Sequence, residues 1–311
     1  MLLTSPNPAI FNIARGSLHD GPGIRTVIYF KGCSMNCEWC HNPEGMDPLP
    51  QIAQSESKCV KCGRCVSICP GHHKISDGGE VKYIRDMCEK CGRCAAACPN
   101  GALEMCGKKE TAETLMAEIR KDSHYYAVSG GGATFSGGEC LLYPQFLREL
   151  LKGCREENIH TVIETALNVP WGNIEAILPF ADAFLADIKH MDPKTHKKYT
   201  GAGNALILGN LKKLSDLSPG AFEVTARVPL IPSVNDSRGN LLETAEFAHR
   251  QKNIKRLELL KYNPMAKGKY ERLGKQCANF GDDAQTDAQM DDICETINRF
   301  LGAENFAAYK K

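Results

Sequence analysis

The sequence predicts an α/β fold, an open partial (β/α)6 TIM-like barrel that carries an inserted cysteine-rich unit. Two observations lead to this prediction. Strand-like and helix-like segments alternate along most of the chain, and residues 51–104 hold two matched sets of cysteines. Alternating strands and helices form a parallel sheet with right-handed crossovers, and six such units are too few for the usual eight-stranded barrel. We therefore expect a barrel made of residues 1–50 and 105–311, interrupted by the insert at 51–104.

Six segments are predicted to be strands because they are short, apolar and rich in β-branched or aromatic residues. They occupy residues 26–30, 133–136, 161–165, 183–189, 222–230 and 256–262. Segments with apolar residues at helical spacing are predicted to be helices, at residues 111–126, 144–159, 174–180, 204–217, 241–251 and 287–301. Pro144 suits the first turn of its helix, where no intrahelical partner for an amide is needed.

Composition narrows the class of protein. The chain has 311 residues, of which 42% are hydrophobic, and a formal net charge of +1. That charge balance gives no reason to expect nucleic acid or an anionic membrane as a partner. No run of about 18 apolar residues predicts a membrane span, and residues 1–12 lack the pattern of a secretory signal. We expect a cytoplasmic monomer, in which clustered cysteines act as metal ligands rather than disulfides.

The insert repeats one cysteine pattern. The spacing C-x2-C-x2-C-x3-C-P occurs twice, and it is the pattern of bacterial ferredoxins that hold two [4Fe–4S] clusters. The fourth cysteine of each run binds the other cluster in that pattern. We therefore assign one cluster to Cys59, Cys62, Cys65 and Cys98, and the other to Cys88, Cys91, Cys94 and Cys69. So short a segment has little apolar core, so its clusters should supply much of its stability.

A third cysteine motif follows the first predicted strand. Cys33, Cys37 and Cys40 have the spacing C-x3-C-x2-C, and Trp39 precedes the last of them. Three thiolates can hold three irons of a [4Fe–4S] cube, which usually takes four, so one iron would stay open to a small molecule. The alternatives are a structural zinc site or unrelated buried cysteines. A zinc site usually shows a second C-x2-C or H-x3-H pair, which this motif lacks.

Polar residues gather where the predicted strands end. Active groups of parallel α/β barrels lie at the carboxyl ends of the strands. The residues at these ends are Gly137, Gly138, Glu139, Glu164, Thr165, Asp187 and Lys189, while Arg227 lies within the fifth strand. Each could be an ordinary surface or paired charge when taken alone. Their common position favours a polar ligand, because buried charge without a partner is costly.

The cysteine triad, together with D-G-P-G-I-R at residues 20–25, resembles the radical S-adenosylmethionine (SAM) superfamily. Within that superfamily the chain resembles the glycyl-radical-enzyme activating enzymes, typified by pyruvate formate-lyase activase. The resemblance implies that a reduced cluster cleaves SAM and that the resulting 5′-deoxyadenosyl radical abstracts hydrogen from a glycine of a partner enzyme. It also implies an anaerobic setting, three [4Fe–4S] clusters in all, and a flavodoxin or ferredoxin as electron donor.

The resemblance assigns roles residue by residue. Gly137, Gly138 and Glu139 match the GGE motif that binds the SAM amino group, and Lys189 lies near the SAM carboxylate. Glu164, Thr165 and Asp187 match positions that hold a monovalent cation, although an aspartate is usual at the first, so cation binding stays open here. Arg227 matches an arginine of the substrate cleft. Asp20 and Arg25 belong to the loop near which the target glycine docks.

Some residues depart from the pyruvate formate-lyase activase pattern. Cys140 stands where proline is more usual, and Asn263 stands where that activase has a histidine near SAM. The insert is a further difference, so we expect a different target, such as a choline, glycerol, arylacetate or isethionate lyase or decarboxylase, or a dehydratase. The alternatives are another radical SAM enzyme, such as a sulfatase maturase, or an electron-carrying polyferredoxin. Five cysteines are expected not to be ligands: Cys106, Cys140, Cys154, Cys277 and Cys294.

Overall fold

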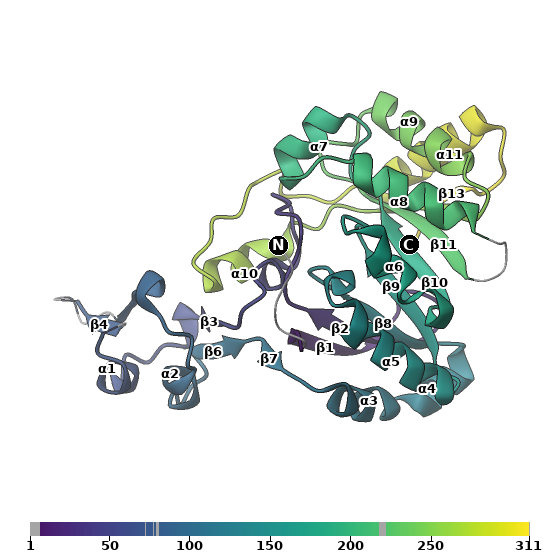
Figure 1. Ribbon diagram of the computed structural model, residues 1–311. Helices are drawn as coiled ribbons and strands as arrows, with labels where there is room; N and C mark the ends of the chain where they lie inside the picture. The colour runs from purple at the N-terminus through teal and green to yellow at the C-terminus, as the bar shows by residue number, and fades with distance from the viewer. Residues whose placement is uncertain (1–6, 72, 77, 79–80, 218–221, 311) are drawn as a thin grey trace.

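The computed structural model describes residues 7–71, 73–76, 78, 81–217 and 222–310. Its main feature is a nine-stranded sheet in the order β13-β12-β11-β10-β9-β8-β2-β1-β7. Among the described residues no pairing joins β13 to β7, so the sheet curves without closing (Figure 1). The bounds of its strands are β1 Ala9–Ser17, β2 Arg25–Phe30, β7 Lys108–Lys109, β8 Gly132–Gly137, β9 His160–Thr165, β10 Ala183–Asp187, β11 Glu223–Pro229, β12 Ile254–Leu260 and β13 Ala307–Tyr309.

The six predicted strands correspond to β2, β8, β9, β10, β11 and β12, which pair in parallel in this order. Their carboxyl ends therefore share one edge of the sheet. The sheet has three strands more than the sequence predicted. β1 runs antiparallel to β2. It was not predicted because Asn12, Arg15 and Gly16 interrupt its apolar residues. β7 and β13 are two and three residues long, too short to give a pattern.

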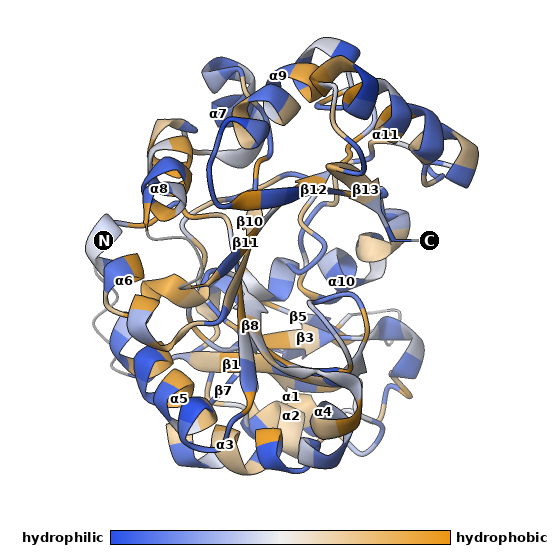
Figure 2. Ribbon diagram, turned by 90° about the vertical axis from the view of Figure 1, so that its right-hand side faces the viewer, coloured by the Kyte–Doolittle hydropathy of each residue, from blue (hydrophilic) through white to orange (hydrophobic). Residues whose placement is uncertain are grey.

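Helices cover the outer face of the sheet (Figure 1), and apolar side chains fill the space between the helices and the strands. Hydrophobic and hydrophilic residues alternate along α5 (Figure 2), which buries Phe146, Leu147, Leu150 and Leu151 against the strands. Burial of such side chains is the main force that holds the layers together. The helices of this part are α3 Ala112–Arg120, α4 Ser123–Ser129, α5 Pro144–Glu156, α6 Trp171–Glu175, α7 Pro193–Thr200, α8 Ala205–Asp216, α9 Arg238–His249, α10 Lys267–Arg272 and α11 Asp287–Leu301.

The helices of this part differ from the prediction in several places: α10 was not predicted, and the segment predicted as a helix at 174–180 forms the end of α6 and a 3-10 turn at Leu178–Phe180. The segment predicted as one helix at 111–126 forms α3 and α4, separated at Asp122, whose carboxylate accepts hydrogen bonds from Arg15 and from Thr26. Helix α7 was not predicted, although Asp192 caps its amino end and Pro193 occupies its first position. Both are recognised helix-start signals, so the sequence did contain the information.

The segment between the triad and α3 leaves the main sheet and returns to it. Strands β3 (Gln51–Gln54) and β6 (Leu103–Cys106) pair antiparallel, so the chain enters and leaves side by side. Between them lie α1 (Arg64–Ile68), β4 (His73–Ile75), β5 (Val81–Tyr83) and α2 (Arg93–Ala96). This segment projects from the sheet on the side of α10 (Figure 1). None of the helices in the described ranges is both long and apolar enough to cross a membrane.

Candidate active site

A cavity of about 300 Å³ lies at the carboxyl ends of the parallel strands. It brings together most of the residues that the sequence singled out. Its lining includes Cys33, Cys37, Trp39, Cys40, Gly137, Gly138, Glu164, Thr165, Asp187, Lys189 and Asn263. These residues come from the loop after β2 and from the ends of β8, β9, β10 and β12. The topology explains the meeting, because parallel strands deliver their following loops to the same edge.

The triad loop is held by backbone hydrogen bonds to two other segments. The Gly32 amide donates to Gly45 O over 2.7 Å, and the Asn36 amide donates to Thr200 O, at the end of α7, over 2.8 Å. Trp39 packs against Tyr199 and the ring of Phe280. Burial raises the pKa of the Cys33 thiol to about 12. Three thiols facing one cavity, one buried and two half-buried, suit iron, because a metal stabilises the thiolate form that burial disfavours.

Gly137 and Gly138 let the backbone of β8 approach the triad loop closely. Gly137 has φ +113, and a Cβ there would lie 2.2 Å from the Phe30 nitrogen. A Cβ on Gly138 would lie 2.2 Å from the Gly32 oxygen. No other residue fits either position without moving the backbone. The glycines therefore hold the end of β8 against the segment that carries the cysteines.

Glu139 differs from its neighbours, because its side chain is not part of the cavity wall. The carboxylate is buried and accepts hydrogen bonds from the Thr165 hydroxyl at 2.8 Å, the Leu141 amide at 3.2 Å and the Ala166 amide at 3.1 Å. Burial raises its pKa to about 7, although these donors lower it. Glu139 thus ties the loop after β8 to the loop after β9, and positions both around the cavity.

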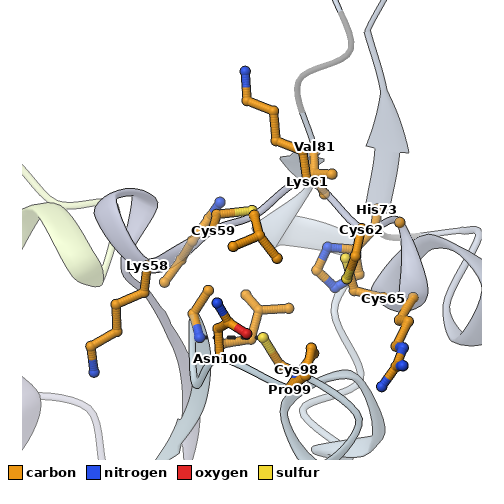
Figure 3. A pocket seen from close by; sticks show the side chains of 16 residues that line it. Lys58, Cys59, Lys61, Cys62, Cys65, His73, Val81, Cys98, Pro99 and Asn100 are labelled. Carbon is orange, nitrogen blue, oxygen red and sulfur yellow. Dashed lines mark hydrogen bonds between the residues drawn. The ribbon is translucent and has the colours of Figure 1, made fainter.

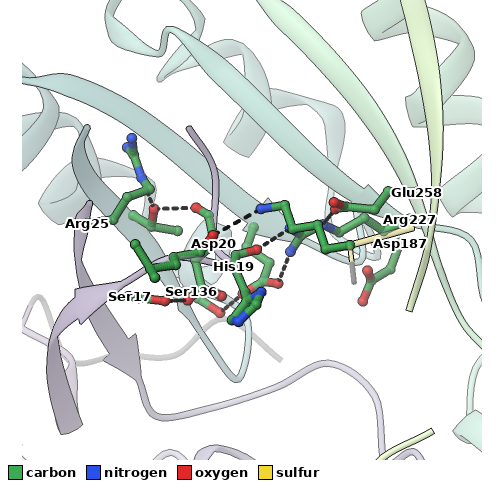
Figure 4. Close-up of polar contacts among 12 residues, drawn as sticks. Ser17, His19, Asp20, Arg25, Ser136, Asp187, Arg227 and Glu258 are labelled. Atoms are coloured by element: carbon green, nitrogen blue, oxygen red, sulfur yellow. Dashed lines mark hydrogen bonds and ion pairs between the residues drawn. The ribbon is translucent and has the colours of Figure 1, made fainter. Parts of the chain in front are cut away.

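A layer of paired charges lies inside the sheet (Figure 4), and three of its members, Glu164, Asp187 and Lys189, line the cavity. Arg227 donates from Nη1 to Glu164 at 2.9 Å and from Nε to Glu258 at 2.5 Å. Lys189 contacts Asp187 at 2.7 Å. Burial alone would lower the pKa of Lys189, but the Asp187 carboxylate raises it. Both carboxylates that lined up with a cation site therefore already have cationic partners from this chain.

Arg25 is the first residue of β2, at the opposite end of the strand from the triad. Its guanidinium is fully buried and donates to Thr134 Oγ1 at 2.6 Å, Ala133 O at 2.6 Å, Pro22 O at 3.0 Å and His160 O at 3.1 Å. Burial lowers its pKa to about 10. None of these partners lines the cavity. The contacts of Arg25 therefore hold neighbouring strands together away from the cavity.

Asp20 belongs to the loop before β2 and is only half-buried. Its carboxylate accepts a hydrogen bond from Ser17, and its carbonyl accepts one from Thr134 at 2.7 Å. The neighbouring His19 carbonyl accepts from Arg227 at 2.6 Å, so this loop reaches the charged layer (Figure 4). Neither Asp20, Arg25 nor Arg227 lines the cavity. The residues predicted for the substrate cleft and the docking loop are therefore not part of the cavity wall, although Arg227 contacts Glu164, which is.

The insert forms a second cysteine-lined cavity (Figure 3). Cys59, Cys62, Cys65 and Cys98 all line it, which is the crossed set that the repeat predicted. Cys98 also receives backbone N–H bonds, including one from Ala102 at 3.2 Å. Such donors stabilise a thiolate, and the pKa of Cys98 is lowered although burial opposes this.

The other four insert cysteines interact electrostatically with one another. Burial raises the pKa of Cys94, and Cys69, Cys88 and Cys91 each raise it further through charge repulsion. The donor set is all sulfur, which suits iron–sulfur clusters and not hard cations.

Some residues of the site were missed by sequence reasoning. Glu258 is a single acidic residue in the apolar strand β12, and its burial beside Arg227 gave no local pattern. Ser136 donates to Glu164 and also lines the cavity. Thr200 and Tyr199 hold the triad loop from a helix that was not predicted. Only the start signals of α7 could have pointed to the last two.

The comparisons with known proteins agree with this geometry. The Radical SAM superfamily profile matches residues 87–247, a 4Fe-4S dicluster domain matches residues 51–99, and a 4Fe-4S single cluster domain matches residues 19–64. The chain is 42% identical over 277 residues to the (2S)-3-sulfopropanediol dehydratase activating enzyme of Klebsiella oxytoca, which covers 87% of this chain and 86% of that one. It is 41% identical over 305 residues to the trans-4-hydroxy-L-proline dehydratase activating enzyme of Clostridioides difficile, covering 96% and 98%.

A solved structure shows the same fold. The radical SAM methyltransferase from Sphaerobacter thermophilus superposes with a TM-score of 0.54 at 13% identity, covering 98% of this chain and 78% of that one. The chain therefore belongs to the radical SAM superfamily. Within it, the protein is one of the activating enzymes of glycyl radical enzymes, which cleave SAM and generate a radical.

Proposed function

We propose that this activating enzyme holds three [4Fe–4S] clusters and binds SAM in the cavity at the carboxyl ends of the strands. The observation that carries the proposal is that Cys33, Cys37 and Cys40 share this one cavity with Asp187 and Lys189. Three thiols can hold a cluster with one open iron, and the charged pair beside them suits the amino and carboxylate groups of SAM. A bound cluster would supply the electron that SAM cleavage requires.

The chain's own residues would bind and orient SAM. Gly137 and Gly138 line the cavity and would present backbone groups to its amino group. The Lys189 ammonium would attract the SAM carboxylate, and Trp39 and Asn263 would bound the cavity on the other side. Glu139 would act through Thr165 and the Ala166 amide, because its carboxylate is turned away from the cavity.

Residues 51–104 would form a ferredoxin-like unit inserted into an open (β/α)6 barrel made of residues 1–50 and 105–311. Support comes from the crossed cysteine cavity, and from the pairing of β3 with β6 that closes the segment on itself. The dicluster match to residues 51–99 points the same way. The two clusters would receive electrons from a flavodoxin or ferredoxin, in the cytoplasm, and the enzyme would act as a monomer.

The partner would be a glycyl radical lyase, dehydratase or decarboxylase other than pyruvate formate-lyase. Two relatives over nearly the whole length are activating enzymes of dehydratases, and Asn263 and the insert depart from the pyruvate formate-lyase activase pattern. A glycine is a suitable target because no side chain blocks approach to its α-carbon.

A monovalent cation has less support than SAM. Glu164 already pairs with Arg227, which it shares with Glu258, and Asp187 pairs with Lys189, so each carboxylate has a cationic partner within the chain. SAM affinity measured in potassium, sodium and tetramethylammonium salts decides the matter. Equal affinity in the three salts argues against a cation site, and tighter binding in one alkali salt argues for it.

Selective removal of cysteines tests the proposal. Anaerobic reconstitution should give about twelve irons per chain, four for each cube. Cys37→Ala should abolish SAM cleavage and leave about eight irons, while Cys62→Ala should keep SAM cleavage with dithionite. Cys277→Ala, outside all three sets, is the matched control and should keep both the iron and the activity. A wild-type protein that holds only one cube when fully reconstituted would refute the three-cluster proposal.

A further inference from the structure

One arginine of the insert is fitted into the barrel wall. Arg85 begins the short turn Arg85–Met87, whose carbonyl at Arg85 accepts from the Cys88 amide at 3.0 Å. Its Nη1 donates to Ile52 O at 2.8 Å, and its Nη2 donates to Arg272 O at 2.9 Å. Arg272 O lies at the carboxyl end of α10, where carbonyls lack helical partners and the helix dipole attracts a cation. Arg85 thus joins the turn before Cys88 to the barrel.

The barrel leaves room for this side chain at Gly274. Gly274 has φ +66, and a Cβ there would lie 2.2 Å from Arg85 Nε and 2.8 Å from Arg85 Cδ. Any other residue would collide with the guanidinium and would also strain the backbone. Arg85 therefore occupies a defined socket rather than an open surface.

The same helix reaches the radical SAM triad. Lys269, one turn before the Arg85 contact, donates from Nζ to His41 O at 2.9 Å and to Asn42 Oδ1 at 3.0 Å. His41 and Asn42 directly follow Cys40. Helix α10 has only six residues, so a single rigid turn links the Arg85 socket to the segment that carries the triad.

A second contact joins the same two regions. Lys90 Nζ lies 3.6 Å from Asp47, which follows the triad in the chain. Arg85 and Lys90 both come from the stretch that carries Cys88 and Cys91. Helix α2, which carries Cys94, also lies nearer the main sheet than α1, which carries Cys65 (Figure 1). The second cysteine set is therefore the one adjacent to the barrel.

We propose that Arg85 is a positioning residue: it holds the set of Cys69, Cys88, Cys91 and Cys94 at a fixed separation from the triad, through α10. This set then stands between the SAM site and the set of Cys59, Cys62, Cys65 and Cys98. The proposal rests on the proposed function, because it assumes clusters in the insert. A reduced flavodoxin or ferredoxin would lose one electron and the SAM site would gain it, with Arg85 fixing the last separation to be crossed.

The test compares variants on both sides of the socket in the reconstituted enzyme. Arg85→Ala removes the arginine, Gly274→Ala fills the socket from the barrel side, and Lys82→Ala changes an exposed cation of the insert as a control. Hydrogen exchange at 267–274 and 85–92 should quicken roughly tenfold to a hundredfold in the first two, since hydrogen bonds of a charged donor are lost.

The second measurement separates position from chemistry. The rate of 5′-deoxyadenosine formation with reduced flavodoxin, divided by the rate with dithionite, should fall in Arg85→Ala and Gly274→Ala and stay unchanged in Lys82→Ala. Arg85→Lys should recover only part of this ratio, because an ammonium cannot bridge two carbonyls as a guanidinium does.

Each other outcome decides against a specific claim. Unchanged exchange and an unchanged ratio in both socket variants would overturn the role of Arg85. Loss of insert iron in both variants would show a purely structural role, and would overturn the positioning role. Only four irons in the unaltered protein would instead refute the proposed function on which this inference rests.

Discussion

Arg227 donates from Nη1 to Oε1 of Glu164 over 2.9 Å, joining β11 to β9 across the strand β10 that lies between them. The same guanidinium contacts Glu258 of β12 and the His19 carbonyl of the loop before β2. One buried cation therefore connects the cavity wall, through Glu164, with the loop that carries Asp20. The charged layer joins β9, β11 and β12, and it also contributes Glu164, Asp187 and Lys189 to the cavity wall.

Removing Arg227 should be costly to stability. Arg227→Met leaves Glu164 and Glu258 buried without their cation, and removing one member of a buried pair typically costs about 3–5 kcal/mol. We expect a loss of that size in chemical unfolding of the reconstituted enzyme. The double variant Arg227→Met with Glu258→Gln should recover part of it, because one of the unpaired charges is then gone. No recovery in the double variant would contradict this account.

Glu139 should give the enzyme a pH-dependent stability. Burial raises its pKa from 4.5 to about 7, so between these values the folded state holds a proton that the unfolded chain has lost. The contribution of Glu139 to the unfolding free energy therefore falls as pH rises from about 4.5 to about 7, and then levels off.

Glu139→Gln removes this titration. The unfolding free energies at pH 5 and pH 8 should then differ less than they do in the wild type. The reduction can reach roughly 3 kcal/mol, because the pKa of Glu139 rises from 4.5 to about 7 on folding. Glu156→Gln, on the exposed face of α5, is the control and should keep the wild-type pH profile. Equal profiles for Glu139→Gln and wild type would show that this carboxyl does not titrate in that range.

Arg25 should matter for stability and not for SAM binding. Arg25→Ala removes the buried guanidinium that donates to the carbonyls of Ala133, Pro22 and His160, and a hydrogen bond of a charged group contributes about 1.5–3 kcal/mol. We expect a loss of several kcal/mol in chemical unfolding, with unchanged SAM affinity per folded molecule. Arg148→Ala, exposed on α5, should change stability by no more than about 0.5 kcal/mol. Weakened SAM binding by a folded Arg25→Ala protein would restore a direct role in the site.

The position of the cavity could be predicted from the sequence because a parallel sheet brings the carboxyl ends of its strands to one edge. Knowing that strands end near residues 137, 165 and 187 was enough to bring Gly137, Thr165 and Asp187 to one edge. The repeat likewise gave the crossed grouping of Cys98 with the first insert set.

Side-chain direction and long-range pairing were not accessible in the same way. Glu139 follows its strand as expected, yet its carboxylate turns inward to Thr165. Arg25 is the first residue of β2 and the triad follows the last, so the length of the strand separates them. The loop motif drew attention to Arg25 as a docking residue instead. Glu258 pairs with Arg227, its register partner on the adjacent strand β11, but the two are 31 residues apart in the chain, so no local pattern records the pair.

Asp20 should affect radical transfer and leave SAM binding intact. It does not line the cavity at the carboxyl ends of the strands, but it lies beside the charged layer, where its charge adds to the effect of burial in raising the pKa of Glu164. Its loop is fixed at both sides, by Thr134 on the Asp20 carbonyl and by Arg227 on the His19 carbonyl. The carboxylate is half-buried, and so remains accessible to a docked peptide.

Asp20→Ala should therefore keep SAM affinity and lower the yield of glycyl radical on the partner, because a misplacement of about 1 Å can reduce a rate roughly 100-fold. Electron paramagnetic resonance of the partner measures the radical, and 5′-deoxyadenosine release measures cleavage. Asp20→Asn keeps an acceptor for the Ser17 hydroxyl and should recover more radical than Asp20→Ala if loop position is what matters. A parallel fall of SAM affinity and radical yield would place Asp20 in the SAM site instead, and an unchanged radical yield would remove it from the reaction.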